Sequence, residues 1–231
     1  MTAADLIIRP ATVDDVRATS FAHSEMLPMG LFPALGVRFL RQWHKTVLAA
    51  PHGVLLVAVD RADGAYGGFL LGSTDHLTHT DALLRAWRSF FALALTGAVA
   101  LLRNPSLAAE FARTRAVRWT RRIARAFVRS SRTAHGGSPQ TAVLAGVAVF
   151  PGFRERGVGA ALVNEFLKQC ATDGAEVAEL ITDLQNENAA RFYELLDWVP
   201  AGDSVTRDGN PIRLYRYFLN GGGTLPYRDR Q

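Results

Sequence analysis

Cysteine is almost absent from this sequence, since Cys170 is the single one among 231 residues. No disulfide can form within the chain, which favours a reducing, cytoplasmic location. The first residues lack a basic stretch followed by a long apolar one, so we expect no signal peptide. The longest apolar run, residues 90–102, has 13 residues. A helix that crosses a bilayer needs about 20, so we expect no spanning segment.

The sequence also lacks the motifs of several enzyme classes. It has no Gly-Lys-Ser/Thr element of a Walker loop and no G-x-S-x-G nucleophile motif. Leu162 stands where a dinucleotide-binding G-x-G-x-x-G pattern needs its third glycine. His76 and His79 have no matching Cys or His pair, so we expect no metal site and two solvent-facing side chains. Cys170 falls in a predicted helix, where we expect a buried thiol without a nucleophilic role.

The sequence does contain enough apolar residues for one large core. Hydrophobic residues make up 48% of the chain, so we expect a single domain over residues 1–218 and a flexible tail over 219–231. The formal net charge is +5 and is distributed unevenly. Residues 76–137 hold 11 arginines and two carboxylates, a charge of +9, and the remainder carries −4. The basic character therefore belongs to one segment.

Apolar periodicity predicts strands that alternate with helices. Hairpins combined with β-α-β units indicate a mixed sheet with helices packed on it, an α/β fold. The predicted strands are 6–12, 53–60, 65–75, 141–150 and 176–184, followed by a hairpin over 204–219 that turns near Asp208 and Gly209. The predicted helices are 13–27 with Thr12 as N-cap, 36–50, 158–174 and a short one within 186–198.

Residues 76–137 interrupt this order and predict an insertion of two helices, about 81–102 and 105–132. In the second helix aromatic and aliphatic residues share one stripe, and arginines occupy much of the remainder. A packed lid with a solvated arginine face explains the pattern. Binding of an anionic acceptor or carrier, docking on an anionic membrane surface and homodimer formation are alternatives. The aromatic spacing follows the helix and not a base-stacking platform, which disfavours nucleic acid.

The stretch RERGVG, residues 154–159, lies between a predicted strand and a predicted helix. The first N–H groups of a helix have no partner within it, and this helix end carries a partial positive charge, so such turns bind phosphates. Gly157 and Gly159 let the backbone approach a ligand and adopt unusual φ and ψ. Arg154 and Arg156 can add charged hydrogen bonds. We therefore predict a pyrophosphate site.

Together with NENAARFYELLDW, residues 186–198, this loop resembles the GCN5-related N-acetyltransferase (GNAT) superfamily. The resemblance is specific over 147–198 and looser over 6–75 and 140–218. It implies a GNAT-type α/β (α+β) fold, in which helices flank a mixed, mostly antiparallel central sheet. It also implies acetyl-CoA as cosubstrate. Asp197 stands where the family has a glycine, and aspartate tolerates a left-handed φ.

The resemblance also implies roles for individual residues. The strand before the loop would splay from its neighbour and offer the backbone of Val147 and Val149 to the pantetheine arm, with Asn186 nearby. Tyr193 matches the tyrosine that faces the thioester sulfur. A thiol has a pKa near 8.5 and tyrosine one near 10, so this hydroxyl can donate a proton as the thiolate forms. The pyrophosphate would be held by Arg154, Arg156, Gly157, Val158, Gly159 and Ala160.

The general base has no clear candidate in the sequence. An alkylamine with a pKa near 10 is only about 0.1% neutral at pH 7, so a base or a water should accept its proton. Many family members carry a glutamate on the strand before the loop, but residues 143–149, VLAGVAV, contain no carboxylate. The candidates that remain are Glu25, His23, Asp75 with its neighbour His76, and Asp183.

These features predict an acetyl-CoA-dependent N-acetyltransferase that acts on the primary amine of a small molecule, with an amino sugar as the first choice of acceptor. One alternative is a protein or peptide N-acetyltransferase. Another is a non-catalytic CoA-binding sensor or membrane adaptor. The missing strand carboxylate favours the non-catalytic alternative, whereas Tyr193 argues against it.

Overall fold

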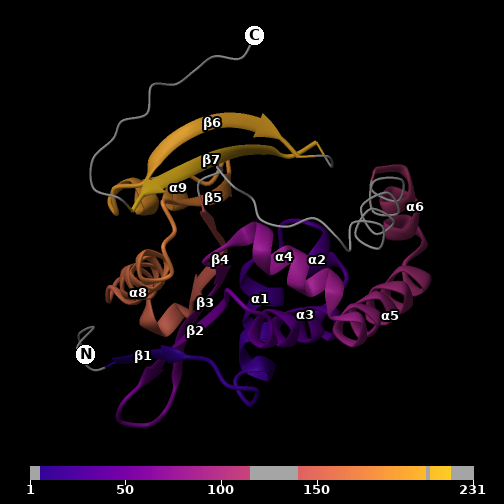
Figure 1. Ribbon diagram of the computed structural model, residues 1–231, viewed down its shortest axis with the longest axis horizontal. Coiled ribbons are helices and arrows are strands. Elements are labelled where there is room, and N and C mark those ends of the chain that lie inside the picture. The colour runs from indigo at the N-terminus through magenta and orange to yellow at the C-terminus, as the bar shows by residue number, and fades with distance from the viewer. Residues whose placement is uncertain (1–5, 115–139, 207–208, 220–231) are drawn as a thin grey trace.

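A computed structural model describes residues 6–114, 140–206 and 209–219. They fold around a seven-stranded sheet with the order β1-β2-β3-β4-β5-β7-β6 (Figure 1). Neighbouring strands are antiparallel, except that β4 and β5 are parallel, which confirms the predicted mixed sheet. The strands are β1 (Leu6–Pro10), β2 (Gly53–Asp60), β3 (Tyr66–Ser73), β4 (Thr141–Val149), β5 (Val177–Asp183), β6 (Val199–Val205) and β7 (Pro211–Phe218).

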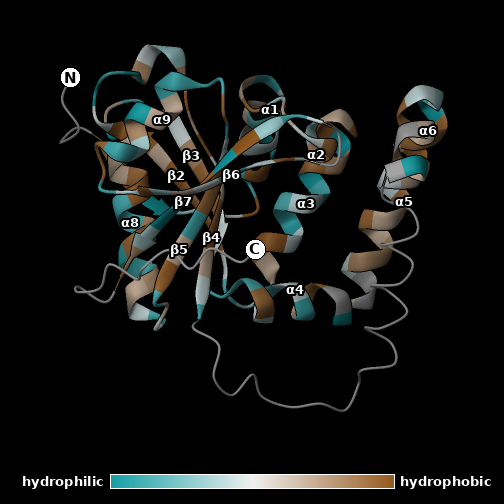
Figure 2. Cartoon of the chain, turned by 90° about the horizontal axis from the view of Figure 1, so that it is seen from above, coloured by the Kyte–Doolittle hydropathy of each residue, from teal (hydrophilic) through white to brown (hydrophobic). Residues whose placement is uncertain are grey.

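Helices cover both faces of this sheet (Figure 2). Helices α1 (Val16–Met26) and α3 (Val37–Ala49) pack on one face, with the short α2 (Leu31–Ala34) between them in sequence. Helices α8 (Val158–Thr172) and α9 (Glu187–Glu194) pack on the other. The predicted bounds of α3, α8 and α9 agree with the observed ones within two residues at the start of each helix.

The side chains of strand β2 pack on both faces of the sheet. Successive side chains of a strand point to opposite sides. Leu55 and Val57 accordingly pack with α1 and α3, whereas Leu56 and Ala58 pack with α8. The uninterrupted apolar run of this strand is therefore buried on both sides, as expected for the interior of a three-layer fold.

The predicted N-cap of the first helix is wrong. Thr12 precedes the helix by several residues, and α1 begins only at Val16. The carboxylate of Asp15 instead accepts hydrogen bonds from the backbone N–H and the hydroxyl of Thr12 at 2.6 and 3.0 Å. These bonds hold the chain in a turn before the helix starts. The expectation for Asp197 is confirmed, since its φ is 62°.

The insertion begins differently from the prediction. The expected helix at 81–102 is two helices, α4 (His76–Arg85) and α5 (Trp87–Arg103), which meet at Ala86. Helix α4 starts early because the Asp75 carboxylate accepts hydrogen bonds from the N–H groups of Leu77 and Thr78 at 3.1 and 3.0 Å. Ala86 then leaves the helical region with ψ 71°.

The second insertion helix, α6 (Pro105–Thr114), begins at the predicted proline. The Asn104 amide oxygen accepts a hydrogen bond from Leu107 N at 3.4 Å. The rest of the predicted helix to residue 132, with most of its arginines, lies outside the described residues. Among the described residues no single helix is both long and apolar enough to cross a bilayer. Only Ser89–Arg103 and Pro105–Arg113, bent by 117°, meet that length and composition as a pair.

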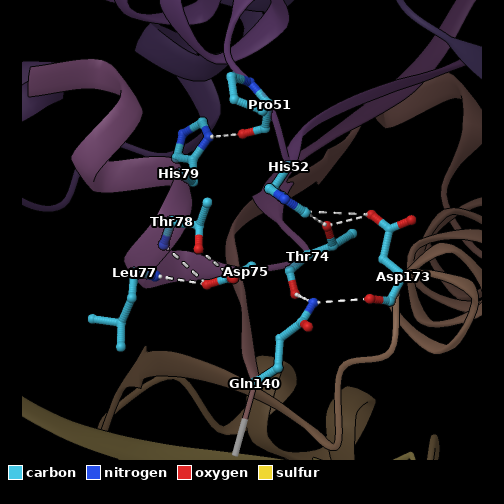
Figure 3. A network of polar contacts seen from close by, with 9 residues as sticks. All are labelled: Pro51, His52, Thr74, Asp75, Leu77, Thr78, His79, Gln140 and Asp173. Atoms are coloured by element: carbon cyan, nitrogen blue, oxygen red, sulfur yellow. Dashed lines mark hydrogen bonds and ion pairs between the residues drawn. The ribbon is translucent and has the colours of Figure 1, made fainter. Parts of the chain in front are cut away.

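The residues that flank the insertion are joined by a network of hydrogen bonds (Figure 3). The Gln140 amide donates hydrogen bonds to the carbonyls of Thr74 and Asp173, at 3.3 and 3.0 Å. The Thr74 hydroxyl donates to the Asp173 carboxylate at 2.6 Å. The residue after β3, the residue before β4 and the residue after α8 thus form one network. It fixes where the insertion leaves and rejoins the sheet.

A second polar network links Asp15, the residue before α1, to β1 and β3. The Asp15 carboxylate, buried at 2% exposure, pairs with the Arg9 guanidinium at 2.7 and 3.0 Å and accepts a hydrogen bond from the Tyr66 hydroxyl. Burial by itself would raise the pKa of this carboxyl. The bonds from Arg9, Thr12 and Tyr66 outweigh burial and hold the pKa well below its usual range.

We expect Asp15→Asn to lower the free energy of unfolding at pH 7 by roughly 2–3 kcal/mol, because it removes the acceptor of a buried charged network. The folded-state pKa lies below the unfolded one near 4, so ionisation stabilises the fold above about pH 4 and ceases to do so as the pH falls further. Urea unfolding at pH 7 and pH 3 should therefore show a smaller difference between variant and wild type at pH 3. The exposed neighbour provides the control, Asp14→Asn, and an equal effect of both substitutions would contradict this account.

Candidate active site

The sheet opens between β4 and β5. These parallel strands pair only at Thr141–Val177, Ala142–Ala178 and Val143–Glu179. Beyond Val143 the register of β4 continues on β3 alone, up to Val149. The opening therefore begins at the end of β4 near the following loop and closes at Val143. This confirms a splayed strand at the place where the sequence predicted one.

Among the described strands, β4 has no neighbour along this opening on the side away from β3. The Val149 carbonyl accepts a hydrogen bond from Arg154 Nε at 3.3 Å, whereas the Ala148 carbonyl points at Gly68 of β3. Alternate residues of a strand point their carbonyls the same way. The carbonyls of Val147 and Val149 therefore both point away from β3. This is the direction expected for residues that bind the amides of an extended ligand.

A bulge interrupts β4 near the closed end of the opening. Gly146 pairs with Leu71 and Leu144 pairs with Gly72, so Ala145 is an extra residue without a partner on β3. The end of α1 covers this point closely, because a Cβ on Gly146 would lie 2.9 Å from Leu27 Cδ1. Helix α1 thus packs directly over the middle of β4.

The loop after β4 leads into a helix start with free donors. Pro151–Phe153 forms a single 3₁₀ turn, Glu155 has φ 61°, and Gly157 has φ 76° and ψ 4°. No side chain caps the N-terminus of α8. The first N–H groups of this helix are therefore available to an anion, and Gly157 meets the left-handed geometry that the turn requires. The strand, loop and helix order is confirmed.

Gly159 has a second physical reason to be glycine. A Cβ at this position would lie 3.1 Å from Phe192 Cζ and 3.5 Å from Val149 Cγ2. Its missing side chain therefore lets α8 approach α9.

Arg156 lies over the ring of Phe153, with 5.5 Å between its Cζ and the ring centroid. Val158 is fully buried under the loop.

Helix α9 carries two predicted residues, Asn186 and Tyr193. Asn186 caps the helix, and its Oδ1 accepts a hydrogen bond from Ala189 N at 3.0 Å. Tyr193 is 6% exposed, and its ring lies 5.1 Å from Phe192 and 5.8 Å from Trp198 between centroids. Burial raises the pKa of the Tyr193 phenol above its ordinary value. The phenol is therefore protonated at neutral pH, as a proton donor must be.

The four candidate bases do not lie together. Three of them are carboxylates that are either exposed or already accept hydrogen bonds. Asp75 caps α4, Asp183 accepts a hydrogen bond from the backbone of the following turn at 2.8 Å, and Glu25 is exposed on α1. His23 alone is buried between α1 and the sheet. Its ring stacks on Phe69 at 5.9 Å between centroids, and Phe69 pairs with β4.

His23 belongs to a buried chain of hydrogen bonds that the sequence gave no sign of. His23 Nδ1 lies 3.1 Å from His44 Nε2, and His44 Nδ1 lies 3.0 Å from the Thr19 hydroxyl. That hydroxyl can donate to the Val16 carbonyl at 3.4 Å. When this hydroxyl donates to Val16, His44 Nδ1 donates to Thr19 and His23 Nδ1 donates to His44 Nε2. In this arrangement His23 Nε2 holds the lone pair at the end of the chain.

The expectation that His79 faces solvent is wrong. His79 is 6% exposed, and its Nδ1 lies 3.0 Å from the Pro51 carbonyl (Figure 3). A carbonyl can only accept, so Nδ1 carries the proton and Nε2 carries the lone pair. Burial lowers the pKa of this imidazole, which keeps it neutral. The neighbouring His76 is exposed, as expected. Among the described residues no cluster of His, Cys, Asp or Glu could hold a metal ion.

The insertion encloses a cavity of about 270 Å³ against α3 and the sheet. The wall is formed mainly by aliphatic and aromatic side chains, and β4 contributes Val143 and Ala145 to it. The cavity thus reaches the bulge of β4 from the α1–α3 face. Its lining includes Phe32, Trp43, Val47, Leu71, His79, Leu83, Phe90 and Leu93.

Cys170 is fully buried in α8, as predicted, and burial raises the pKa of its thiol to about 12. A thiol in this state is protonated at neutral pH and is a poor nucleophile.

A comparison with protein families matches residues 107–198 to the acetyltransferase (GNAT) family. No curated protein sequence matches the chain. Solved structures resemble it along almost its whole length, at low sequence identity. The fold is therefore the GNAT acetyltransferase fold, and the family match covers the strand, the loop and the helix that line the opening.

Three of the similar structures illustrate the range of the fold. NAA60 of Arabidopsis thaliana, solved with acetyl-CoA, has a TM-score of 0.57 at 15% identity and covers 94% of this chain and 99% of its own. YncA of Salmonella typhimurium, also solved with acetyl-CoA, has a TM-score of 0.56 at 11% identity and covers 95% and 97%. The spermidine/spermine N-acetyltransferase SpeG of Vibrio cholerae has a TM-score of 0.53 at 12% identity and covers 94% of both chains.

The buried histidine pair predicts loss of stability in mild acid. Burial lowers the pKa of His23 to about 4, and burial together with repulsion from His23 lowers that of His44 to about 3. From pH 6.5 down to about 4 the unfolded chain binds protons that the folded chain does not, so stability falls by up to about 1.4 kcal/mol per pH unit for each histidine. We expect the double variant His23→Asn/His44→Asn to lose this slope in urea unfolding between pH 7 and 5. An unchanged slope would show that the pair titrates normally.

Proposed function

We propose that the chain is a GNAT acetyltransferase that uses acetyl-CoA as its cosubstrate and acetylates the primary amine of a small molecule. The observation that carries this proposal is the opening between β4 and β5, which leads from an uncapped helix start to a buried phenol. The opening has the parts that a long, thin, anionic thioester requires. These parts are a donor-rich end, an unpaired strand and a proton donor.

The residues present fit acetyl-CoA. The N–H groups at the start of α8, with Arg154 and Arg156, would hold the diphosphate. The carbonyls of Val147 and Val149 would accept hydrogen bonds from the amides of the pantetheine arm. When bound, the cosubstrate supplies an activated acetyl group as a thioester. An arm that enters beside the loop and follows β4 reaches the closed end of the opening near the bulge.

Two protons move during the acetyl transfer: one leaves the amine, and one is donated to the sulfur. The amine nitrogen forms a bond to the carbonyl carbon, the carbon–sulfur bond breaks, and sulfur leaves as a thiolate. Tyr193 donates its proton to that thiolate, because the buried phenol is protonated at neutral pH. The amine gives up one proton to a base or a water. The protonation states return to the start when the phenol regains a proton.

Among the four candidate bases, His23 has the best position. It lies one turn before Leu27, whose side chain packs over Gly146 beside the bulge. Its hydrogen-bond chain through His44 leaves Nε2 as the unprotonated nitrogen. Burial keeps the ring neutral, which leaves a lone pair to accept a proton from an amine or an intervening water, but it also makes this imidazole a weaker base than an exposed one. Glu25, Asp75 and Asp183 are exposed, or their carboxylates are already engaged.

The loop arginines should distinguish a diphosphate site from a simple turn. We expect Arg154→Ala/Arg156→Ala to weaken acetyl-CoA binding about tenfold or more, since each removes a charged hydrogen bond. Activity with S-acetyl-N-acetylcysteamine, a thioester without the diphosphate, should change less than twofold. Calorimetry and initial rates measure the two effects. Arg17→Ala, on α1, is the matched control, and an equal loss with both thioesters would contradict a diphosphate role.

Removal of one hydroxyl tests the proposed proton donor. We expect Tyr193→Phe to lower kcat by roughly 100-fold, because the thiolate then leaves without a proton donor. The dissociation constant of CoA should stay within about twofold. Tyr217→Phe removes a hydroxyl from the same aromatic cluster and should leave kcat nearly unchanged. A wild-type kcat in the Tyr193 variant would remove this residue from the mechanism, and lost CoA binding would assign it a packing role.

A further inference from the structure

The cavity beneath the insertion reaches β4 at the closed end of the opening. The thioester arm follows β4 on the face that carries α8, α9 and Tyr193, because Val147 and Val149 pack with that cluster. Val143 and Ala145 line the cavity on the opposite face, which carries α1 and α3. Both compartments meet at the bulge of β4. Direct transfer requires the thioester and the amine to be bound at the same time. In this arrangement each of them occupies its own face of the sheet, and the two sites meet at the bulge.

The chemistry of the wall restricts what the cavity can hold. Among the described residues, none that line it is a carboxylate, a lysine or an arginine. Phe32, Trp43 and Phe90 contribute aromatic surface, and Leu83 and Leu93 contribute aliphatic surface. A charged or heavily hydroxylated molecule would lose its hydration here without compensation. An apolar body gains about 0.8 kcal/mol for each buried methylene.

Three polar side chains of the wall, Thr46, His79 and Thr80, already use their donor hydrogens within the protein. The Thr46 hydroxyl donates to the Trp43 carbonyl at 2.6 Å, and the Thr80 hydroxyl donates to the His76 carbonyl at 2.7 Å. His79 Nδ1 donates to Pro51. The lone pairs of these two hydroxyls and of His79 Nε2 remain as acceptors, and they suit the N–H groups of an amine.

We propose that this cavity binds the body of the acceptor, and that the acceptor is a primary amine carrying an apolar aliphatic or aromatic group. The inference rests on the proposed function and narrows its substrate class. A cavity of 150 Å³ holds benzene, so about 270 Å³ admits a group of roughly ten heavy atoms. The body lies between α3, α5 and the sheet, and the amine faces the bulge.

A series of amines tests the proposal. Thiol release from acetyl-CoA is measured with ethanolamine, glucosamine, spermidine, 2-phenylethylamine and the linear amines from propylamine to decylamine. We expect kcat/KM to rise about fourfold per added methylene until the cavity is filled, and then to level off. 2-Phenylethylamine should exceed ethanolamine by at least 100-fold. A series without dependence on chain length, or a preference for glucosamine or spermidine, would overturn the assignment.

Variants of α5 test whether the cavity causes the dependence of kcat/KM on the chain length of the amine. Leu93→Trp and Ser89→Phe fill the cavity and should abolish the gain from longer chains, whereas Leu93→Ala should move the plateau to longer amines. Leu102→Trp is the matched control, because this residue lies on the same helix, 83% exposed and outside the wall. The KM of acetyl-CoA should stay unchanged in all four. If Leu93→Trp and Leu102→Trp behave alike, the cavity is not the acceptor site.

Two further measurements separate the proposal from its premise. If the variants alter the preferred acyl length in a series of acyl-CoA thioesters and not the preferred amine, the cavity holds the acyl chain and the proposal fails. If no amine releases thiol, the proposed function fails. Calorimetric titration of the CoA-bound protein with hexylamine then decides the cavity assignment. Binding that Ser89→Phe reduces tenfold or more supports the assignment, and absence of binding overturns it.

Discussion

The separation of β4 from β5 is the constraint on which the rest of the site depends. Backbone N–H and C=O groups within a protein need partners, and parallel neighbours normally supply them. Here the pairing with β5 stops at Val143, so the next residues of β4 turn backbone groups toward a gap in the sheet. The chain then turns at Gly157 into a helix whose first donors are unpaired. One interruption of the sheet therefore yields both a strand for a thioester arm and an anion site at its outer end.

This part of the site could be predicted from the sequence because its causes are local. The strand, loop and helix around RERGVG follow from short-range rules, since a left-handed residue before a helix favours glycine, which Gly157 provides. Local periodicity also anticipated the burial of Cys170 in α8, whereas the left-handed φ of Asp197 was expected from the glycine that the family has at this position. Tyr193 could be located only through its resemblance to a family motif. Periodicity alone would have described it as a core aromatic residue, and its ring does lie in an aromatic cluster.

The remaining features depend on contacts between distant segments, which local patterns do not encode. His79 is buried because Pro51 offers its carbonyl across 28 positions in the chain. The histidines at 23 and 44 meet because α1 and α3 pack side by side. The early start of α4 had a local signal in Asp75, an N-cap residue that the apolar periodicity hid. Gly159 was interpreted as a residue for ligand approach, yet the ring that requires its small size belongs to Phe192.

The absence of a carboxylate on β4 acquires a physical explanation when the cavity is considered. A carboxylate near the reacting nitrogen would stabilise the ammonium form and raise the pKa of the amine. An apolar wall has the opposite effect, because burial disfavours the charged form and lowers that pKa toward neutrality. Each unit of lowering increases the neutral, nucleophilic fraction about tenfold at pH 7. In the proposed arrangement, an acceptor bound among Trp43, Phe90 and Leu93 would be deprotonated more readily because it is desolvated. A weak neutral acceptor such as His23, or a water beside it, then suffices to take the proton as the new bond forms.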